Sequence, residues 1–424
     1  MDYTGSNINA DFEAMWNSIV TDFPAMADAY ATANLAVHYT HNCIDFETRF
    51  FPEWAGLRNE LEEIFASDTL SLQAVATALA AAVNDYAGTD NDAADALDKA
   101  QDDLPDEVPD MTSPRTPPSR HNQAPPAAVP PSIDTEYDAA LTFQQLQTKA
   151  QTTDDKQWEA EMAERSLLGK IPIWIAGREK TEEIARDSGM YTFTTEKVAE
   201  VSQIDPKQFQ IAISCLKSIA EGTTPFSQFE QEVSNAKDAL HPDKWDGTAA
   251  GTFRSEFLNV YPDVVDNQVP IVGSLLGAME GFQKGVKDTY DSYDEAMDAA
   301  IKAYDQIIAE ADAAHASLMT AVLSAAISIA GAIAAGPGGI SYALAGAGVS
   351  IAGAGYSVGG SKAADVHESL FAGLDKAKEK LDEFDEELQG AMKTDTNTVS
   401  SRVSNPKGKV RLPRPAFVDS DGGF

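Results

Sequence analysis

Cysteine and basic residues are scarce in this 424-residue sequence, and each scarcity excludes a class of protein. The two cysteines, Cys43 and Cys215, are too few and too far apart for a disulfide framework or a zinc-binding pattern. Only 31 Lys and Arg stand against 67 Asp and Glu, which gives a net charge of −36. Because binding to phosphates needs clustered Lys and Arg, this balance argues against nucleic acid and against adsorption to anionic lipid. It favours a well-solvated surface or, alternatively, a docking face for a basic partner.

Patterns typical of an enzyme are absent as well. The sequence contains no phosphate loop, dinucleotide fingerprint or ordered Ser/His/Asp set. His38 and His41 lie three residues apart near Cys43, a spacing that favours a helical surface pair over a metal site. We therefore predict no catalytic residue, no cofactor and no metal. The N-terminus has neither a basic nor an apolar leader region, so export would need a route without a cleaved signal peptide.

Apolar residues recur at helical spacing along most of the chain and predict an all-α fold. Stripes over residues 12–30 and 57–86 predict a helical hairpin, in which Pro24 splits the first arm and Asp68 caps a further helix. Nine prolines between residues 105 and 131 predict an extended linker. The predicted segments are a helical hairpin domain (1–102), a Pro-rich linker (103–135), a connecting helical or irregular segment (136–204), a second helical domain (205–315), an Ala/Gly-rich hydrophobic hairpin (316–361), an amphipathic helix (362–393) and a disordered tail (394–424).

The tripeptide Trp-x-Gly occurs twice, as Trp54-Ala55-Gly56 and as Trp245-Asp246-Gly247. Five tryptophans and 28 glycines would produce less than one such match by chance. Each match follows a proline closely and falls between two helical patterns. Glycine permits a tight turn and an indole can pack across two helices. We therefore predict that Trp54, Gly56, Trp245 and Gly247 shape two inter-helix turns.

A second pattern, Tyr-x-x-x-Asp, follows each tripeptide. Tyr86, which begins the pair with Asp90, lies 32 residues after Trp54. Tyr290, which begins the pair with Asp294, lies 45 residues after Trp245. The number of such pairs is no higher than chance would give, so only their position after each Trp-x-Gly tripeptide is informative. Because residues four apart share one helix face, a receptor could recognise each pair together.

Trp-x-Gly between two helices with Tyr-x-x-x-Asp near the end of the second resembles the WXG family of actinobacterial type VII (ESX) secretion substrates. The second half resembles the larger EspA/EspE-type substrates, and the N-terminal hairpin resembles a small EspC-type partner. The resemblance implies two WXG-like hairpin domains, the second a longer bundle. It also implies that Tyr86, Asp90, Tyr290 and Asp294 form export signals for the secretion ATPase. Two hairpins in one chain could pair with each other in place of the usual heterodimer.

Two glycine-rich features stand out in the second half. Gly273, Gly277, Gly281 and Gly285 recur every fourth residue and predict a closely packed neighbouring helix, although they could be merely weak helix positions. Residues 316–361 contain no Asp, Glu, Lys or Arg, and two runs, 318–335 and 340–358, predict a helical hairpin. Three interpretations stay open for it: burial in the bundle, conditional membrane insertion, and a constitutive membrane anchor.

These observations predict a non-enzymatic protein, secreted or at the cell surface through a type VII pathway, that acts by helical association and at membranes. One alternative is an effector that permeabilises membranes by inserting residues 318–358. Another is an adaptor or chaperone that carries a further protein out. The expected partner is the secretion ATPase; a small WXG-type protein, a membrane and a second copy of the chain are the others considered.

Overall fold

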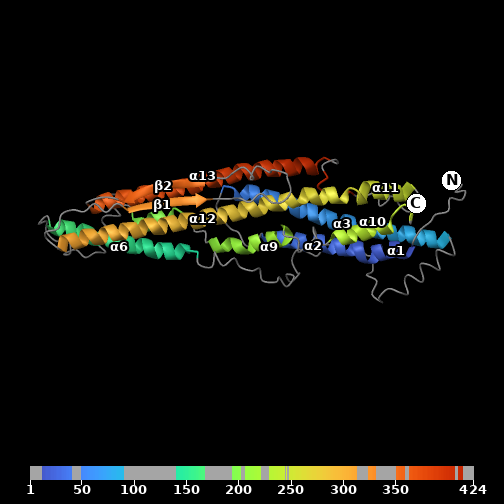
Figure 1. The fold of residues 1–424 in the computed structure, drawn as a ribbon, viewed down its shortest axis with the longest axis horizontal. Coiled ribbons are helices and arrows are strands. Elements are labelled where there is room, and N and C mark those ends of the chain that lie inside the picture. Colours follow the sequence, from blue (N-terminus) through green and yellow to red (C-terminus); the bar gives the residue numbers. More distant parts are fainter. Residues whose placement is uncertain are drawn as a thin grey trace.

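The computed structural model of the chain describes residues 12–40, 49–89, 140–167, 193–201, 206–220, 229–243, 245, 248–312, 323–330, 350–358, 362–405 and 409–413. Within these ranges the protein is an elongated bundle of helices beside one two-stranded ribbon (Figure 1). The prediction of a helical fold is confirmed at this level. In chain order the elements are α1 (Phe12–Asn17), η1 (Ser18–Asp22), α2 (Phe23–Tyr39), α3 (Phe51–Thr89), α6 (Phe143–Leu167), α8 (Thr194–Ala199), η4 (Pro206–Phe209), α9 (Gln210–Ala220), α10 (Phe229–Ala239), α11 (Thr248–Phe253), η5 (Arg254–Leu258), α12 (Tyr261–Asp312), β1 (Leu323–Ala330), β2 (Ser350–Val358) and α13 (Ala363–Val403).

Two long antiparallel helices, α12 and α13, form the spine of the bundle (Figure 1). They contain 52 and 41 residues, which correspond to lengths of about 78 and about 61 Å. The hydroxyl of Ser274 on α12 donates a hydrogen bond to the buried carboxylate of Asp395 on α13 at 2.7 Å. The buried face of α13 continues through Val399. The predicted helix end at residue 393 and the predicted disorder of residues 394–403 are therefore wrong.

Helices α2 and α3 form an antiparallel hairpin that packs on this spine. Tyr30 on α2 meets Phe65 on α3 with ring centroids 5.7 Å apart, and His38 lies 3.0 Å from the Glu62 carboxylate. The buried apolar side chains of the described residues make one continuous core from Met15 to Leu412. Residues 12–89, predicted to belong to a separate N-terminal domain, therefore have no core of their own.

Proline and aspartate affect the first hairpin differently. Pro24 lies in the first turn of α2, directly after a π-helical segment (Ser18–Asp22). The residues at both junctions, Asn17 and Phe23, are helical, so the predicted split at Pro24 is a change of helix type and not a break. Asp68 was predicted to cap a helix, but α3 runs without interruption from Phe51 to Thr89. Asp68 therefore lies in a helix interior, where the apolar stripe around it carries it into the core.

The segment predicted to connect the two halves contributes two helices at one end of the bundle (Figure 1). Polar α6 lies along α12. Its Asp154 carboxylate accepts hydrogen bonds from the backbone N–H groups of Thr194 and Thr195, at 2.7 and 3.2 Å. These bonds satisfy the free N–H groups at the start of α8. The described parts of this segment are thus ordered by contacts between helices.

The uncharged segment contains strands where a helical hairpin was predicted. β1 pairs with β2 in antiparallel register, with Leu323 opposite Val358 and Ala330 opposite Ser350. Both strands contain β-branched or aromatic residues, which favour strands: Ile327 and Ile329 in β1, and Ile351, Tyr356 and Val358 in β2. The prediction of helices over 318–335 and 340–358 is therefore wrong for residues 323–330 and 350–358.

Candidate functional site

Trp54 anchors the first Trp-x-Gly segment at the meeting of α3 and α12. Its side chain is fully buried, and its indole Nε1–H donates a 3.0 Å hydrogen bond to the backbone carbonyl of Leu275 on α12. Its ring also stacks on Phe51, with centroids 5.6 Å apart. Trp54 and Gly56 both lie within α3, so the prediction that they shape a turn is wrong. The tryptophan instead joins the first hairpin to the spine.

Gly56 faces α13, and Arg58 lies beside the Trp54 ring. A side-chain carbon at Gly56 would lie 3.8 Å from the Thr396 methyl group on α13, which is ordinary contact. The Arg58 guanidinium lies 5.8 Å from the Trp54 ring, and burial lowers its pKa while the nearby Glu62 charge opposes that shift. Its Nε and Nη1 atoms are buried and find no hydrogen-bond acceptor among the described residues. The ring contact therefore offsets part of the cost of burying this cation.

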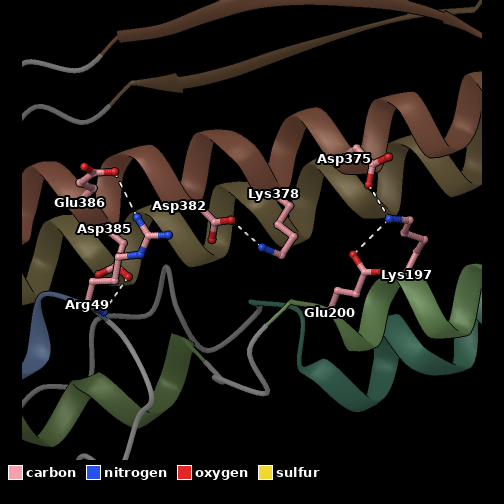
Figure 2. Close-up of polar contacts among 8 residues, drawn as sticks. All are labelled: Arg49, Lys197, Glu200, Asp375, Lys378, Asp382, Asp385 and Glu386. Carbon is pink, nitrogen blue, oxygen red and sulfur yellow. Dashed lines mark hydrogen bonds and ion pairs between the residues drawn. The ribbon is translucent and has the colours of Figure 1, made fainter.

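A carboxylate from α13 holds the start of α3 (Figure 2). The two oxygens of Asp385 accept hydrogen bonds from the backbone N–H groups of Arg49 and Phe50, at 2.8 and 3.0 Å. Burial raises the pKa of Asp385, and these two donors counteract the rise. The guanidinium of Arg49 also pairs with Glu386 at 3.1 Å. Asp385 thus binds the N–H groups of the two residues that precede α3 and fixes the entry of the chain into that helix.

Trp245 lies between α10 and α11, so the second Trp-x-Gly tryptophan occupies an inter-helix connection as predicted. Its indole is buried, and its ring centroid is 6.1 Å from that of Phe253. The Nη1 group of Arg254 donates to the carbonyls of Leu240 and Trp245, at 2.9 and 2.7 Å. Arg254 therefore closes the turn, a role that the sequence did not reveal. Gly247 lies outside the described residues.

The first hairpin packs through Phe23 on α2 against the segments that follow Trp245. Phe23, at the start of α2, lies 6.2 Å from Phe253 and 6.3 Å from Phe257 between ring centroids. Farther along, the Tyr30 hydroxyl donates to the Gln268 side-chain oxygen at 2.9 Å. Together with the Trp54 contact on α12, these interactions join α2 and α3 to α11, η5 and α12 over several helical turns.

The second Tyr-x-x-x-Asp pair lies on α12, where α6 covers part of it. The Tyr290 side chain is only 1% exposed, and the side chain of Asp294 is 29% exposed. Lys149 on α6 binds the carboxylates of both Asp294 and Asp298, each at 2.6 Å. In this fold, therefore, Tyr290 is unavailable to a receptor and Asp294 already has a cationic partner.

The first Tyr-x-x-x-Asp pair is described only in part. Tyr86 belongs to helix α3, near its end, which agrees with the predicted helical location. Its side chain and all of Asp90 lie outside the residues whose placement is described.

The four-residue glycine pattern does not form one interface. A carbon placed on Gly285 would come within 3.2 Å of the Phe384 ring on α13, so this glycine permits close packing. At Gly273 the same carbon would meet nothing within 4 Å. Because four residues turn a helix by about 400°, successive glycines drift by about 40° and the ends of the pattern point in different directions. The predicted packing holds at Gly285 and fails at Gly273; Gly277 and Gly281 are partly exposed.

A buried polar cluster around Asp68 was missed by the sequence analysis. The Asp68 side chain is 0% exposed and accepts hydrogen bonds from Gln268 Nε2 at 2.6 Å and from the backbone N–H of Leu412 at 2.7 Å. Burial raises its pKa from 3.8 to about 7, while the two donors and the Arg411 charge oppose the rise. The signal available in the sequence was an acid at position 68 within the apolar stripe that contains Phe65 and Leu72.

Metal and membrane features are limited in the described part of the chain. No group of three or more His, Cys, Asp or Glu side chains is placed there to hold a metal ion. Cys215 is partly buried, and Cys43 lies outside the described residues. One helical stretch, Phe51–Val83, is long and apolar enough to cross a membrane, with 44% of its most apolar window buried in the bundle. A core helix has the same composition, so this stretch is only weak support for membrane insertion.

Comparison of the chain with known protein families, with curated proteins and with solved structures finds no match to any of them.

Proposed function

We propose that this chain is a non-enzymatic protein exported by a type VII (ESX-like) secretion system, and that the first hairpin and the helices that follow Trp245 act as each other's partner. The observations that support this best are the contacts between them: Phe23 meets Phe253 and Phe257, and Trp54 binds the Leu275 carbonyl. In the family that the sequence resembles, hairpins of this kind are often paired. Here both would come from one polypeptide.

This pairing accounts for the absence of a separate core in residues 12–89. A small WXG-type protein would have to occupy the face of α3 that contacts α12 and α13. That face holds the fully buried Trp54, and Asp385 on α13 binds the N–H groups ahead of α3. We therefore propose that the chain needs no second WXG-type protein to fold.

The proposed export signal is the pair Tyr290 and Asp294 on α12. A receptor that recognises both groups must either displace α6 at Lys149 or bind the chain before α6 docks, because Lys149 holds Asp294 at 2.6 Å and Tyr290 is 1% exposed. Export would then depend on how firmly α6 is held. Its described apolar contribution to the core is small: Leu146, Ala150 and Ala160 are the buried apolar side chains that it supplies.

The pathway is tested by expressing the chain in an actinobacterial host with an active type VII system and in the same host without the secretion ATPase. We expect the protein in the culture filtrate only when the ATPase is present, with a cytoplasmic enzyme as the marker for lysis. Equal amounts in both filtrates would refute the proposal.

The signal is tested with two aspartates that bind the same lysine. Asp294→Ala and Asp298→Ala each remove one carboxylate from Lys149, but only Asp294 belongs to the proposed signal. We expect Asp294→Ala to abolish export and Asp298→Ala to leave it close to the wild-type level. Tyr290→Ala and Tyr293→Ala form a second pair, because both rings are 1% exposed and both changes leave a cavity. Equal export of the two members in both pairs would show that the signal lies elsewhere.

A further inference from the structure

Residues 409–413 cross the contact line between α3 and α12, named here the α3–α12 seam, and side chains from both helices bind their backbone. The carbonyls of Lys409 and Val410 accept hydrogen bonds from α12, and the N–H of Leu412 donates one to α3. These three bonds are Asn267 Nδ2 to the Lys409 oxygen at 3.2 Å, Gln268 Nε2 to the Val410 oxygen at 2.8 Å, and the Leu412 N–H to Asp68 Oδ1 at 2.7 Å. The backbone is thus recognised by fixed donors and an acceptor, independent of its side chains.

The side chains of this segment alternate between the core and the surface. Val410 and Leu412 are 1% and 4% exposed, and both belong to the continuous apolar core. Lys409 pairs with Asp263 on α12, and Arg411 lies 3.5 Å from the Glu63 carboxylate on α3. Alternate side chains of the segment therefore enter the host protein, although its backbone bends at Val410 and Arg411.

The backbone at Lys409 has a φ of 50°, in the left-handed region that a non-glycine residue seldom adopts. Such a conformation persists where surrounding contacts hold it. At this position the contacts are the Asp263 ion pair and the Asn267 hydrogen bond. The seam therefore imposes the geometry of the bound segment.

We propose that the α3–α12 seam is a recognition site for a short peptide with alternating basic and apolar residues, and that its resident ligand is the chain's own segment 409–413, held reversibly. Asp68, Asn267 and Gln268 recognise the peptide backbone. Asp263 and Glu63 select basic side chains at the outward positions, and the core accepts the apolar ones. The proposal is independent of the export pathway.

The resident segment has a large advantage over any free peptide. It follows α13 after a short connection, and a short tether raises the effective concentration of a linked ligand to the millimolar range. A free peptide can therefore occupy the seam only after the resident segment has been weakened. This requirement sets the design of the experiment.

The test uses the full chain with Val410→Ser and Leu412→Ser, which removes both apolar contacts and leaves the seam intact. The probe is a fluorescein-labelled peptide of residues 404–415, and binding is measured by anisotropy. The control probe is the same peptide with the two serine substitutions, because its equal positive charge reports non-specific attraction to a chain of net charge −36. We expect the variant to bind the native peptide at least tenfold more tightly than the control peptide. The wild-type chain should bind both weakly, and adding Gln268→Ala to the variant should reduce binding of the native peptide.

Two results would overturn the proposal. One is a folded variant, by circular dichroism, that binds both peptides equally or neither. The other comes from the wild-type chain, which covers the case in which the variant does not fold. Reversible release of the segment predicts that the Leu412 amide exchanges its hydrogen faster than the core amides of α12; exchange at the same rate as those amides would mean that the segment leaves only when the bundle unfolds.

Discussion

Replacement of Asp68 by Asn should remove a pH dependence of stability that this one buried carboxyl creates. The carboxyl group lies among Gln268, Leu412 and Arg411, and the tyrosines Tyr30 and Tyr261 face the same cluster. Glu63 pairs with Arg411, and Glu232 lies near Tyr261. Asparagine has nearly the same shape as aspartate, but its side-chain amide does not titrate.

The magnitude follows from the shift in pKa. Burial raises the pKa of Asp68 from 3.8 to about 7. Between these values the folded chain binds more protons than the unfolded chain, so the free energy of unfolding falls as the pH rises. From pH 5.5 to pH 8 this linkage reduces the folding equilibrium constant about 30-fold, which is about 2 kcal/mol. The contribution is fully present below about pH 4 and is lost above about pH 7.

Urea unfolding of the wild-type chain and of Asp68→Asn at pH 5.5 and pH 8 measures this contribution of Asp68 to the free energy of unfolding. Burial also raises the pKa of Asp22, Asp154, Asp288 and Asp385, so both proteins should lose stability as the pH rises. The difference between the two proteins isolates Asp68. We expect the wild type to lose about 2 kcal/mol more than the variant between the two pH values. A difference that stays constant with pH would refute the assignment of a shifted pKa to Asp68.

Four further substitutions test the packing of the spine. Gly285→Ala should destabilise the chain, because its new methyl group would lie 3.2 Å from the Phe384 ring. Gly273→Ala should instead stabilise the chain by up to about 1 kcal/mol through helix propensity, because its methyl group would meet nothing within 4 Å. Urea unfolding of the two variants measures the sign of each change in the free energy of unfolding. Trp54→Phe removes the indole donor to Leu275 and should cost about 1 kcal/mol or more in the same assay, with no loss contradicting the anchoring role. Asp385→Ala should cost about 1 kcal/mol or more and speed hydrogen exchange of the Arg49 and Phe50 amides, whereas unchanged exchange of these two amides would exclude this role of Asp385.

Helix positions could be predicted where their signals are local. Pro24 in the first turn of α2, Pro206 before α9 and Thr248 at the start of α11 act on their own neighbours, so their effect is visible in a short stretch of sequence. Trp245 was likewise correctly placed between two helices. The burial of Trp54 could be expected from its size, although its position inside α3 could not.

The remaining features depend on partners that are distant in sequence. Asp68 has the residue type of a helix cap, and its two donors, the Gln268 side chain and the Leu412 amide, lie 200 and 344 residues away and explain why a carboxyl group is tolerated in the core. Position 409 onward was predicted to be disordered because its composition is polar, but Val410 and Leu412 find an apolar site that another part of the chain supplies. The pairing of β1 with β2 likewise requires two strands to meet across a long connection.

The dependence of α3 on α13 also sets an order of events during synthesis. The N–H groups of Arg49 and Phe50, ahead of α3, donate hydrogen bonds to Asp385, which lies 336 residues beyond Arg49. Until α13 leaves the ribosome, the side of α3 that α13 covers stays exposed, and Phe51–Val83 is long and apolar enough to cross a membrane. Closing so long a loop is slow compared with forming local helices. The contact between α3 and α13 therefore forms only after α12, which binds Trp54, has been synthesised.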